Sequence, residues 1–288
     1  MRTADSNIYI STGAFKTTSL TEMLAICDEL DFHNIELSSG LKWTEHLEEE
    51  IARVNNKCNY LIHNYFPPPQ VPFVLNLAAR NPDVLQLSRD HCKKAVRLCA
   101  AVGSPFFSVH SGFAFEVDPS RLGRNLSHAS RYPLQEAKEI FVDSVQLLCE
   151  YASSFNVAIA IENNVIAPMN LVDGKNLLLL GTTADELLEI RELVNKKNFG
   201  FLIDVGHLKI SANSLHFNVQ QYLSEVQETI TAFHLNDNDG ILDSNLMFDE
   251  RSWFIEELRR FPLKCKVIES YQLTIEQLKQ EISIVRSL

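Results

Sequence analysis

The sequence lacks any hydrophobic run of the ~18 residues that a membrane-spanning helix needs. Its first residues, MRTADSNIYIS, lack a charged segment followed by a long apolar stretch, so we expect no signal peptide and a cytoplasmic protein. The six cysteines are scattered, and no two of them form a Cys-x-x-Cys pair. This pattern argues against a disulfide framework or a zinc knuckle and favours reduced, mostly buried thiols.

Basic residues are also scarce in this chain. The sequence has 26 Lys and Arg against 37 Asp and Glu, which gives a net charge of −11. Such a balance provides no general positive field for a nucleic-acid backbone or an anionic membrane surface. We therefore expect no nucleic acid and no membrane among the partners of the chain.

What the chain does contain is a regular alternation of short β-rich runs and longer helical patterns. Helical periodicity is found in the ranges 19–30, 84–102, 134–155, 183–197, 218–230, 251–261 and 274–288. Strands are predicted at 7–11, 34–38, 60–65, 106–111, 157–163, 199–204, 231–236 and 265–270. These strands are nearly continuous apolar runs, which is typical of parallel strands buried on both faces.

Eight β/α units in 288 residues, of which 45% are hydrophobic, predict an α/β fold of the (β/α)8 TIM barrel type. We expect one domain over 1–288. A doubly wound open sheet is the alternative, but STGAFKTTSL after the first strand carries no glycine-rich dinucleotide fingerprint. Two long connections, 112–133 and 164–182, follow strands and should lie at the carboxyl end of the barrel, where long loops are often lids or binding loops.

Six consecutive predicted strands end in a residue of the metal-ligand type. These residues are His63, His110, Glu162, Asp204, His234 and Glu269. The carboxyl ends of barrel strands converge on one pocket, so these side chains should point to the same place. Carboxylates concentrated there repel one another unless a cation neutralises them. The set therefore predicts a divalent metal, and its carboxylates and imidazoles suit Mn²⁺, Mg²⁺, Co²⁺ or Zn²⁺.

The stretch NFGFLIDVGHLKI, residues 198–210, places a histidine three residues after the strand-ending Asp204. Residues three apart on an uninterrupted strand face opposite sides. We therefore expect Gly206 to let the chain turn after Asp204, so that His207 lies in a loop and reaches back over the site.

Together with the motifs IENN, IDVGH and FHLNDNDG, these residues resemble the xylose isomerase-like TIM barrel superfamily, which holds sugar isomerases and epimerases and the endonuclease IV-like enzymes. The resemblance covers nearly the whole chain, from NIELS to VIES. In the isomerase and epimerase branch it implies one divalent metal held by Glu162, Asp204, His234 and Glu269.

The resemblance also implies a reaction and a substrate pocket. Glu162 and Glu269 double as the acid and base groups that move a proton through a metal-stabilised enediolate of a sugar, sugar phosphate or related polyol-ketone. His207 would bind a substrate oxygen, and Trp43 offers a stacking face for a sugar ring. The residues expected around the substrate are His63, His110, His207, Asp243, Asn245 and Trp43.

Two alternatives to an isomerase stay open. An endonuclease IV-like zinc phosphodiesterase acting on abasic DNA would also use His63 and His110 for a zinc cluster, with a further zinc on His207 and an Asp-x-His motif. This chain has Asp243 and then Asn245 at that motif, and amide oxygens are poor zinc ligands. The second alternative is a catalytically inactive metal-binding barrel. The expected partner is a small carbohydrate, and association into a homo-oligomer stays open.

Overall fold

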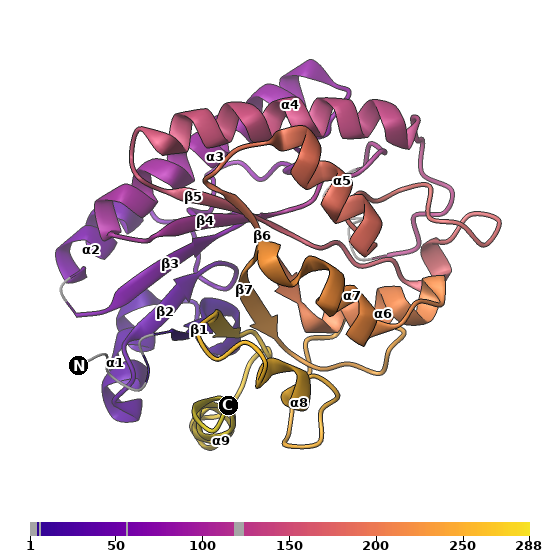
Figure 1. Ribbon diagram of the computed structural model, residues 1–288. Coiled ribbons are helices and arrows are strands. Elements are labelled where there is room, and N and C mark those ends of the chain that lie inside the picture. Colours follow the sequence, from indigo (N-terminus) through magenta and orange to yellow (C-terminus); the bar gives the residue numbers. More distant parts are fainter. Residues whose placement is uncertain (1–4, 6, 56, 118–123) are drawn as a thin grey trace.

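The parallel strands form a closed barrel in the order β1 to β8 in this computed structural model, which describes all residues except 1–4, 6, 56 and 118–123 (Figure 1). Each strand pairs in parallel with its neighbours, and β1 closes the barrel against β8. The strands are β1 (Ile8–Ser11), β2 (Asn34–Leu37), β3 (Asn59–His63), β4 (Phe106–His110), β5 (Ala158–Glu162), β6 (Phe199–Asp204), β7 (Ile230–Leu235) and β8 (Cys265–Ile268). The predicted TIM barrel is therefore confirmed.

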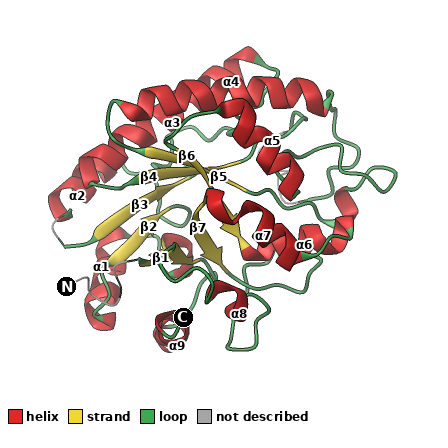
Figure 2. Ribbon diagram, viewed as in Figure 1, coloured by secondary structure: helices red, strands yellow, loops and turns green. Residues whose placement is uncertain are grey.

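Helices surround the barrel on the outside (Figure 2). They are α1 (Leu20–Leu30), α2 (Leu47–Val54), α3 (Pro82–Val102), α4 (Leu134–Ser153), α5 (Ala184–Val194), α6 (Val205–Leu215), α7 (Val219–Val226), α8 (Ile255–Leu258) and α9 (Ile275–Arg286). The side chain of Asn81 caps α3 by accepting the N–H of Asp83 at 2.9 Å, and Pro82 follows at the first helical position. None of the described helices has the length and apolar content of a membrane-spanning helix.

Three helices differ from the sequence prediction. α2 and α6 were not predicted, and the helix expected over 251–261 shortens to Ile255–Leu258. α6 begins directly after β6, with Asp204 as its N-cap. His207 therefore lies in the first turn of a helix, and the prediction that it lies in a loop is wrong.

Gly206 has a different role from the one predicted. A Cβ atom at this position would lie 1.9 Å from Oδ1 of Asn236, so the glycine provides room for the start of α6 against the end of β7. It allows a close approach of two elements, and the chain continues as a helix through it.

The barrel interior has a distinct apolar layer. Successive residues of a strand point to opposite faces, so residues two apart share the inner face. The buried side chains of this layer form one hydrophobic cluster of their own: Leu61, Phe106, Ala160, Leu202, Ala232 and Val267. A larger cluster fills the space between the strands and the outer helices. Most of the ligand-type residues lie two positions after a residue of the apolar layer. They therefore share its inner face and lie at the carboxyl ends of the strands.

Candidate metal centre

The strand ends bring titratable side chains together in a layer directly beyond the apolar layer. We call it the polar layer, and its members are Glu36, His63, His110, Glu162, Asp204, His234 and Glu269. Glu36, Asp204 and His234 are completely buried, and Glu162 is 1% exposed. Charged groups are rarely removed from water in this way unless they are paired or bind a metal.

Four of these residues present a set of converging ligand atoms. Glu162, Asp204, His234 and Glu269 each contribute one atom, and all four atoms lie within 4.8 Å of one another. A second set with the same closeness consists of His63, His110 and Glu162. Glu162 belongs to both sets, so it lies at the centre of the polar layer.

Imidazole rings surround the carboxylate of Glu162. Its Oε2 lies 3.3 Å from Nε2 of His63 and 3.3 Å from Nδ1 of His110. Its Oε1 lies 3.5 Å from Nδ1 of His207 and 3.5 Å from Nδ1 of His234. Burial alone would raise the pKa of Glu162, but these imidazoles, His110 first, hold its pKa well below the usual range.

Asp204 is held by hydrogen bonds at both carboxylate oxygens. Oδ1 accepts the backbone N–H of His207 at 2.7 Å, and Oδ2 accepts Nδ2 of Asn236 at 2.7 Å. The side chain of Asn163 braces the same position by accepting the N–H of Asp204 and donating to its carbonyl oxygen. Asp204 therefore ends a strand, begins a helix and keeps a fixed orientation toward the polar layer.

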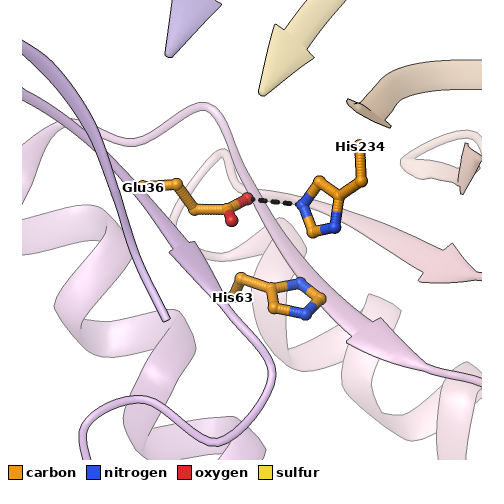
Figure 3. A group of neighbouring side chains, drawn as sticks. All are labelled: Glu36, His63 and His234. Carbon is orange, nitrogen blue, oxygen red and sulfur yellow. Dashed lines mark hydrogen bonds and ion pairs between the residues drawn. The ribbon is translucent and has the colours of Figure 1, made fainter. Parts of the chain in front are cut away.

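His234 lies between two groups of carboxylates. Its Nε2 lies 3.0 Å from Oε2 of Glu36 (Figure 3). Its Nδ1 lies 2.8 Å from Oε2 of Glu269 without hydrogen-bonding geometry, and Nδ1 has no hydrogen-bond partner in the described part of the chain. The two ring nitrogens thus face different neighbours.

Burial and neighbouring charges shift the pKa values of the polar layer away from their ordinary values. Burial raises the pKa of Asp204 to about 7 despite the opposing charge of His207, and it also raises the pKa of Glu269. Burial lowers the pKa values of His63 and His110. Burial would lower the pKa of His234 as well, but the neighbouring carboxylates, Glu269 first, raise it well above its usual range. The layer therefore favours bound positive charge, which protons or a metal cation can supply.

The residues of the four-member set fit a divalent cation. Nδ1 of His234 and Oε2 of Glu162 are buried and have no hydrogen-bond partner among the described residues, although polar atoms lie close to both. A buried polar atom without a partner costs free energy, and a cation between these ligands satisfies it. Three carboxylates and one imidazole suit Mn²⁺, Mg²⁺, Co²⁺ or Zn²⁺.

The remaining residues predicted at the site are not members of the polar layer. Nε2 of His207 lies 3.3 Å from Oδ2 of Asp243, whose side chain is 35% exposed. Asn245 is buried, and its Nδ2 donates to the carbonyl oxygen of Glu269 at 3.4 Å, so it supports the backbone of the site. Trp43 is 43% exposed on the segment after β2, and its proximity to a substrate stays a prediction.

Sequence reasoning missed Glu36, together with the two asparagines that hold Asp204. Glu36 is the third residue of β2, followed by one more apolar residue, so it does not end the apolar run as the other ligand-type residues do. The sequence feature that could have identified Glu36 is its place in β2, because alternate residues of this strand face the barrel interior. Its partner His234 is 198 positions away, and no local pattern in the sequence connects the two.

Comparison with known proteins connects this geometry to a protein family. The family model described as "Xylose isomerase-like TIM barrel" matches residues 24–264. The uncharacterized protein MJ1311 of Methanocaldococcus jannaschii is 27% identical over 187 residues, which is 65% of this chain and 56% of that protein. The chain thus spans a little over half the length of this curated relative.

Solved structures resemble the barrel over nearly its full length. A D-tagatose 3-epimerase-like protein superimposes with a TM-score of 0.73 at 19% identity, covering 98% of both chains. The IOLI protein, solved with a bound zinc atom, gives a TM-score of 0.72 at 16% identity and again 98% coverage of both chains. At these identities the likeness establishes the shared fold.

Proposed function

The chain belongs to the family of xylose isomerase-like TIM barrels, and from this premise we propose that it is a divalent-metal-dependent isomerase or epimerase of a small carbohydrate. The observation that carries the proposal is the convergence of Glu162, Asp204, His234 and Glu269, with ligand atoms within 4.8 Å of one another. The similar fold of a D-tagatose 3-epimerase-like protein supports the sugar class.

The metal would be held by the four residues that converge. When bound, a divalent cation supplies Lewis acidity, which polarises a carbonyl group and makes the neighbouring carbon-bound proton more acidic. The zinc atom bound to the similarly folded IOLI protein supports this assignment. Asn236 and Asn163 keep Asp204 in place for this role through hydrogen bonds to its side chain and its backbone.

The two glutamates are the proposed acid and base groups. Glu162 ends β5 and Glu269 follows β8, and these strands are not neighbours in the barrel. One carboxylate removes a proton from the carbon next to the carbonyl, and the other returns a proton. Return to the adjacent carbon gives isomerisation, and return to the opposite face of the same carbon gives epimerisation.

The substrate would be oriented by polar groups at the rim. Nε2 of His207 and Oδ2 of Asp243 lie 3.3 Å apart there, and His110 is the most exposed imidazole that contacts Glu162. These groups, with His63, Asn245 and Trp43, are the proposed contacts for substrate hydroxyl groups and the sugar ring. Hydroxyl-rich ligands are recognised by such polar side chains at fixed positions.

Deuterium exchange tests this proposal even while the sugar is unidentified. The Mn²⁺-loaded chain is incubated in D2O with a panel of free and phosphorylated ketoses and aldoses, and NMR detects deuterium at the carbon next to the carbonyl. Exchange with at least one sugar, lost in Glu162→Gln and Glu269→Gln, is expected. A chain that binds the metal yet exchanges no proton in any sugar would contradict the proposal and favour a catalytically inactive metal-binding barrel.

A phosphodiesterase is the second candidate, and a specific observation favours it. His63, His110 and Glu162 form a second set of ligand atoms within 4.8 Å, enough for an additional zinc ion. Asn245 in place of a histidine and the net charge of −11 count against it. Two to three zinc ions per chain, with cleavage of a duplex that contains an abasic site, would support this candidate over the isomerase.

A further inference from the structure

We propose that Glu36 is a positioning residue of the metal centre, which holds the ring of His234 so that Nδ1 faces the cation. This inference rests on the proposed function, because it assigns a role relative to the metal. It adds a residue outside the four-member ligand set, on a strand that the sequence analysis did not associate with the site.

The Glu36–His234 pair connects opposite parts of the polar layer. Oε2 of Glu36 and Nε2 of His234, joined by the dashed line in Figure 3, lie 3.0 Å apart, and both side chains are completely buried. Glu36 comes from β2 and His234 from β7, which are separated in the barrel by β8 and β1. The hydrogen bond therefore spans the barrel interior, away from water, where such bonds are strongest.

The geometry assigns different roles to the two nitrogens of His234. A neutral imidazole carries one proton, and a carboxylate can only accept a hydrogen bond. When a cation replaces the second proton of His234, the ring is neutral, and its remaining proton lies on Nε2, which donates to Glu36. Nδ1 keeps its lone pair, and it faces Oε2 of Glu269 at 2.8 Å and Oε1 of Glu162 at 3.5 Å. This is the nitrogen that points to the ligand set.

Glu36 is better placed to orient His234 than to bind a metal itself. Ligand atoms of Glu36, His63 and His234 do lie within 4.8 Å of one another. However, Nδ1 of His63 lies 3.0 Å from Oγ of Ser108, and its Nε2 lies 3.3 Å from Glu162. A cation between Glu36, His63 and His234 would have to break these contacts and the bond between Glu36 and His234.

Metal-binding histidines commonly donate their second N–H to a carboxylate, which fixes the tautomer and the ring orientation and makes the ligand more basic. Loss of such a partner typically weakens metal binding by about 10- to 100-fold. Glu36 meets the geometric requirement for this role, because it accepts from the nitrogen that points away from the ligand set.

Mn²⁺ titration of the full chain by calorimetry tests the role of Glu36. Glu36→Leu should weaken Mn²⁺ binding by about 10- to 100-fold, because no acceptor remains for Nε2–H. Glu36→Gln keeps an acceptor oxygen without the charge, so Mn²⁺ binding should weaken less, within about tenfold. Glu281→Gln is the matched control, because Glu281 is equally buried but belongs to none of the ligand sets, and its Mn²⁺ affinity should match the wild type.

A spectroscopic measurement reads the orientation of the ring directly. In the Zn²⁺-loaded wild type, ¹⁵N NMR of His234, assigned with a His234→Asn variant, should show a protonated Nε2 and a metal-bound Nδ1. This spectrum shows which nitrogen binds the metal even if Glu36→Leu fails to fold, and Glu36→Gln then measures the contribution of the Glu36 carboxylate. Zinc bound through Nε2, or a folded Glu36→Leu variant with wild-type affinity, would overturn the inference.

These measurements separate the inference from the proposed function. A wild type that binds Mn²⁺ with the expected dependence on Glu36, but exchanges no sugar protons, upholds the positioning role and contradicts the isomerase. A wild type that binds no divalent cation overturns both.

Discussion

Two adjacent layers inside the same barrel have opposite chemistry. In the apolar layer, Leu202 and Val267 are completely buried among hydrophobic neighbours. Two positions further along the same strands, Asp204 and Glu269 belong to the polar layer. The inward-facing residues of these strands thus form an apolar layer first. The next inward-facing residues are carboxylates and imidazoles, whose burial costs free energy without a compensating charge.

The two layers are expected to contribute differently, the apolar layer to folding stability and the polar layer to function. The apolar layer stabilises the barrel by removing hydrocarbon surface from water, and this contribution requires no bound charge. The polar layer is held by hydrogen bonds and ion pairs, and its buried carboxylates favour additional positive charge. Substitutions in one layer should therefore alter folding stability, and substitutions in the other should alter metal binding and catalysis.

The largest expected effect is on catalysis by the polar layer. Glu162→Gln or Glu269→Gln, at saturating Mn²⁺, should slow deuterium exchange by about 10²- to 10⁴-fold, because each removes a proposed acid or base group. Val267→Ala, in the apolar layer, is the control and should leave the exchange rate of the folded protein near the wild type. Full activity in both glutamine variants would contradict the assigned roles.

The next effect is on folding stability through the apolar layer. Leu202→Ala should lower the free energy of unfolding by about 2–5 kcal/mol, because it leaves a cavity among well-packed neighbours. Urea denaturation of the metal-free chain measures this change, and calorimetry should find wild-type Mn²⁺ stoichiometry in the folded variant. If Leu202→Ala instead abolished metal binding without loss of stability, the division between the layers would be wrong.

A buried carboxylate outside both layers sharpens the comparison. Glu281 accepts Oγ–H of Ser270 at 2.8 Å and the N–H of Phe248 at 2.9 Å, and burial raises its pKa from the ordinary 4.5 to about 7. Since the folded state holds this proton more tightly than the unfolded state, the contribution to stability is complete below pH 4.5 and is lost as pH rises through about 7.

The free energy of unfolding that is lost when Glu281 ionises corresponds to roughly 3 kcal/mol. Glu281→Gln should remove this part of the pH dependence, because glutamine does not ionise. Between pH 4.5 and 8, the wild type should therefore lose more unfolding free energy than the variant. Urea denaturation at a series of pH values measures it. An unchanged pH profile in the variant would show that Glu281 is ionised in the folded chain over this range.

The smallest of these effects is stabilisation by the metal. A ligand at 100 times its dissociation constant stabilises the folded state by about 2.7 kcal/mol. Mn²⁺ should raise the melting temperature of the wild type and of Leu202→Ala alike. Asp204→Asn, on the same strand as Leu202, should show no such increase. Thermal melts of the three proteins with and without Mn²⁺ measure the difference. An equal increase in Asp204→Asn would place the cation elsewhere.

The strands of the barrel and the convergence of the strand-ending residues were predictable from the sequence because both depend on local patterns. Apolar runs identified all the strands of the barrel, and the ends of those runs identified Glu162 and Asp204. α6 was not predicted, because Asp204 serves at once as strand end and helix N-cap, and the helix it begins is largely buried. A weak amphipathic pattern gives little periodic signal.

The partners of the ligand residues could not be predicted, because they depend on contacts between distant strands. Asn236 reaches Asp204 from the end of β7, and Glu36 reaches His234 across 198 positions. Register and barrel closure determine these contacts, and no sequence window contains both members. Sequence thus predicted which residues form the polar layer more readily than what holds them in place.

Metal content measures the central claim most directly. The wild type and Asp204→Asn are loaded with Mn²⁺ or Zn²⁺, dialysed, and measured by elemental analysis, with circular dichroism confirming that both are folded. The account predicts about one tightly held cation per wild-type chain and its loss in Asp204→Asn. A wild type that retains no cation, or an Asp204→Asn variant that retains as much as the wild type, would contradict it.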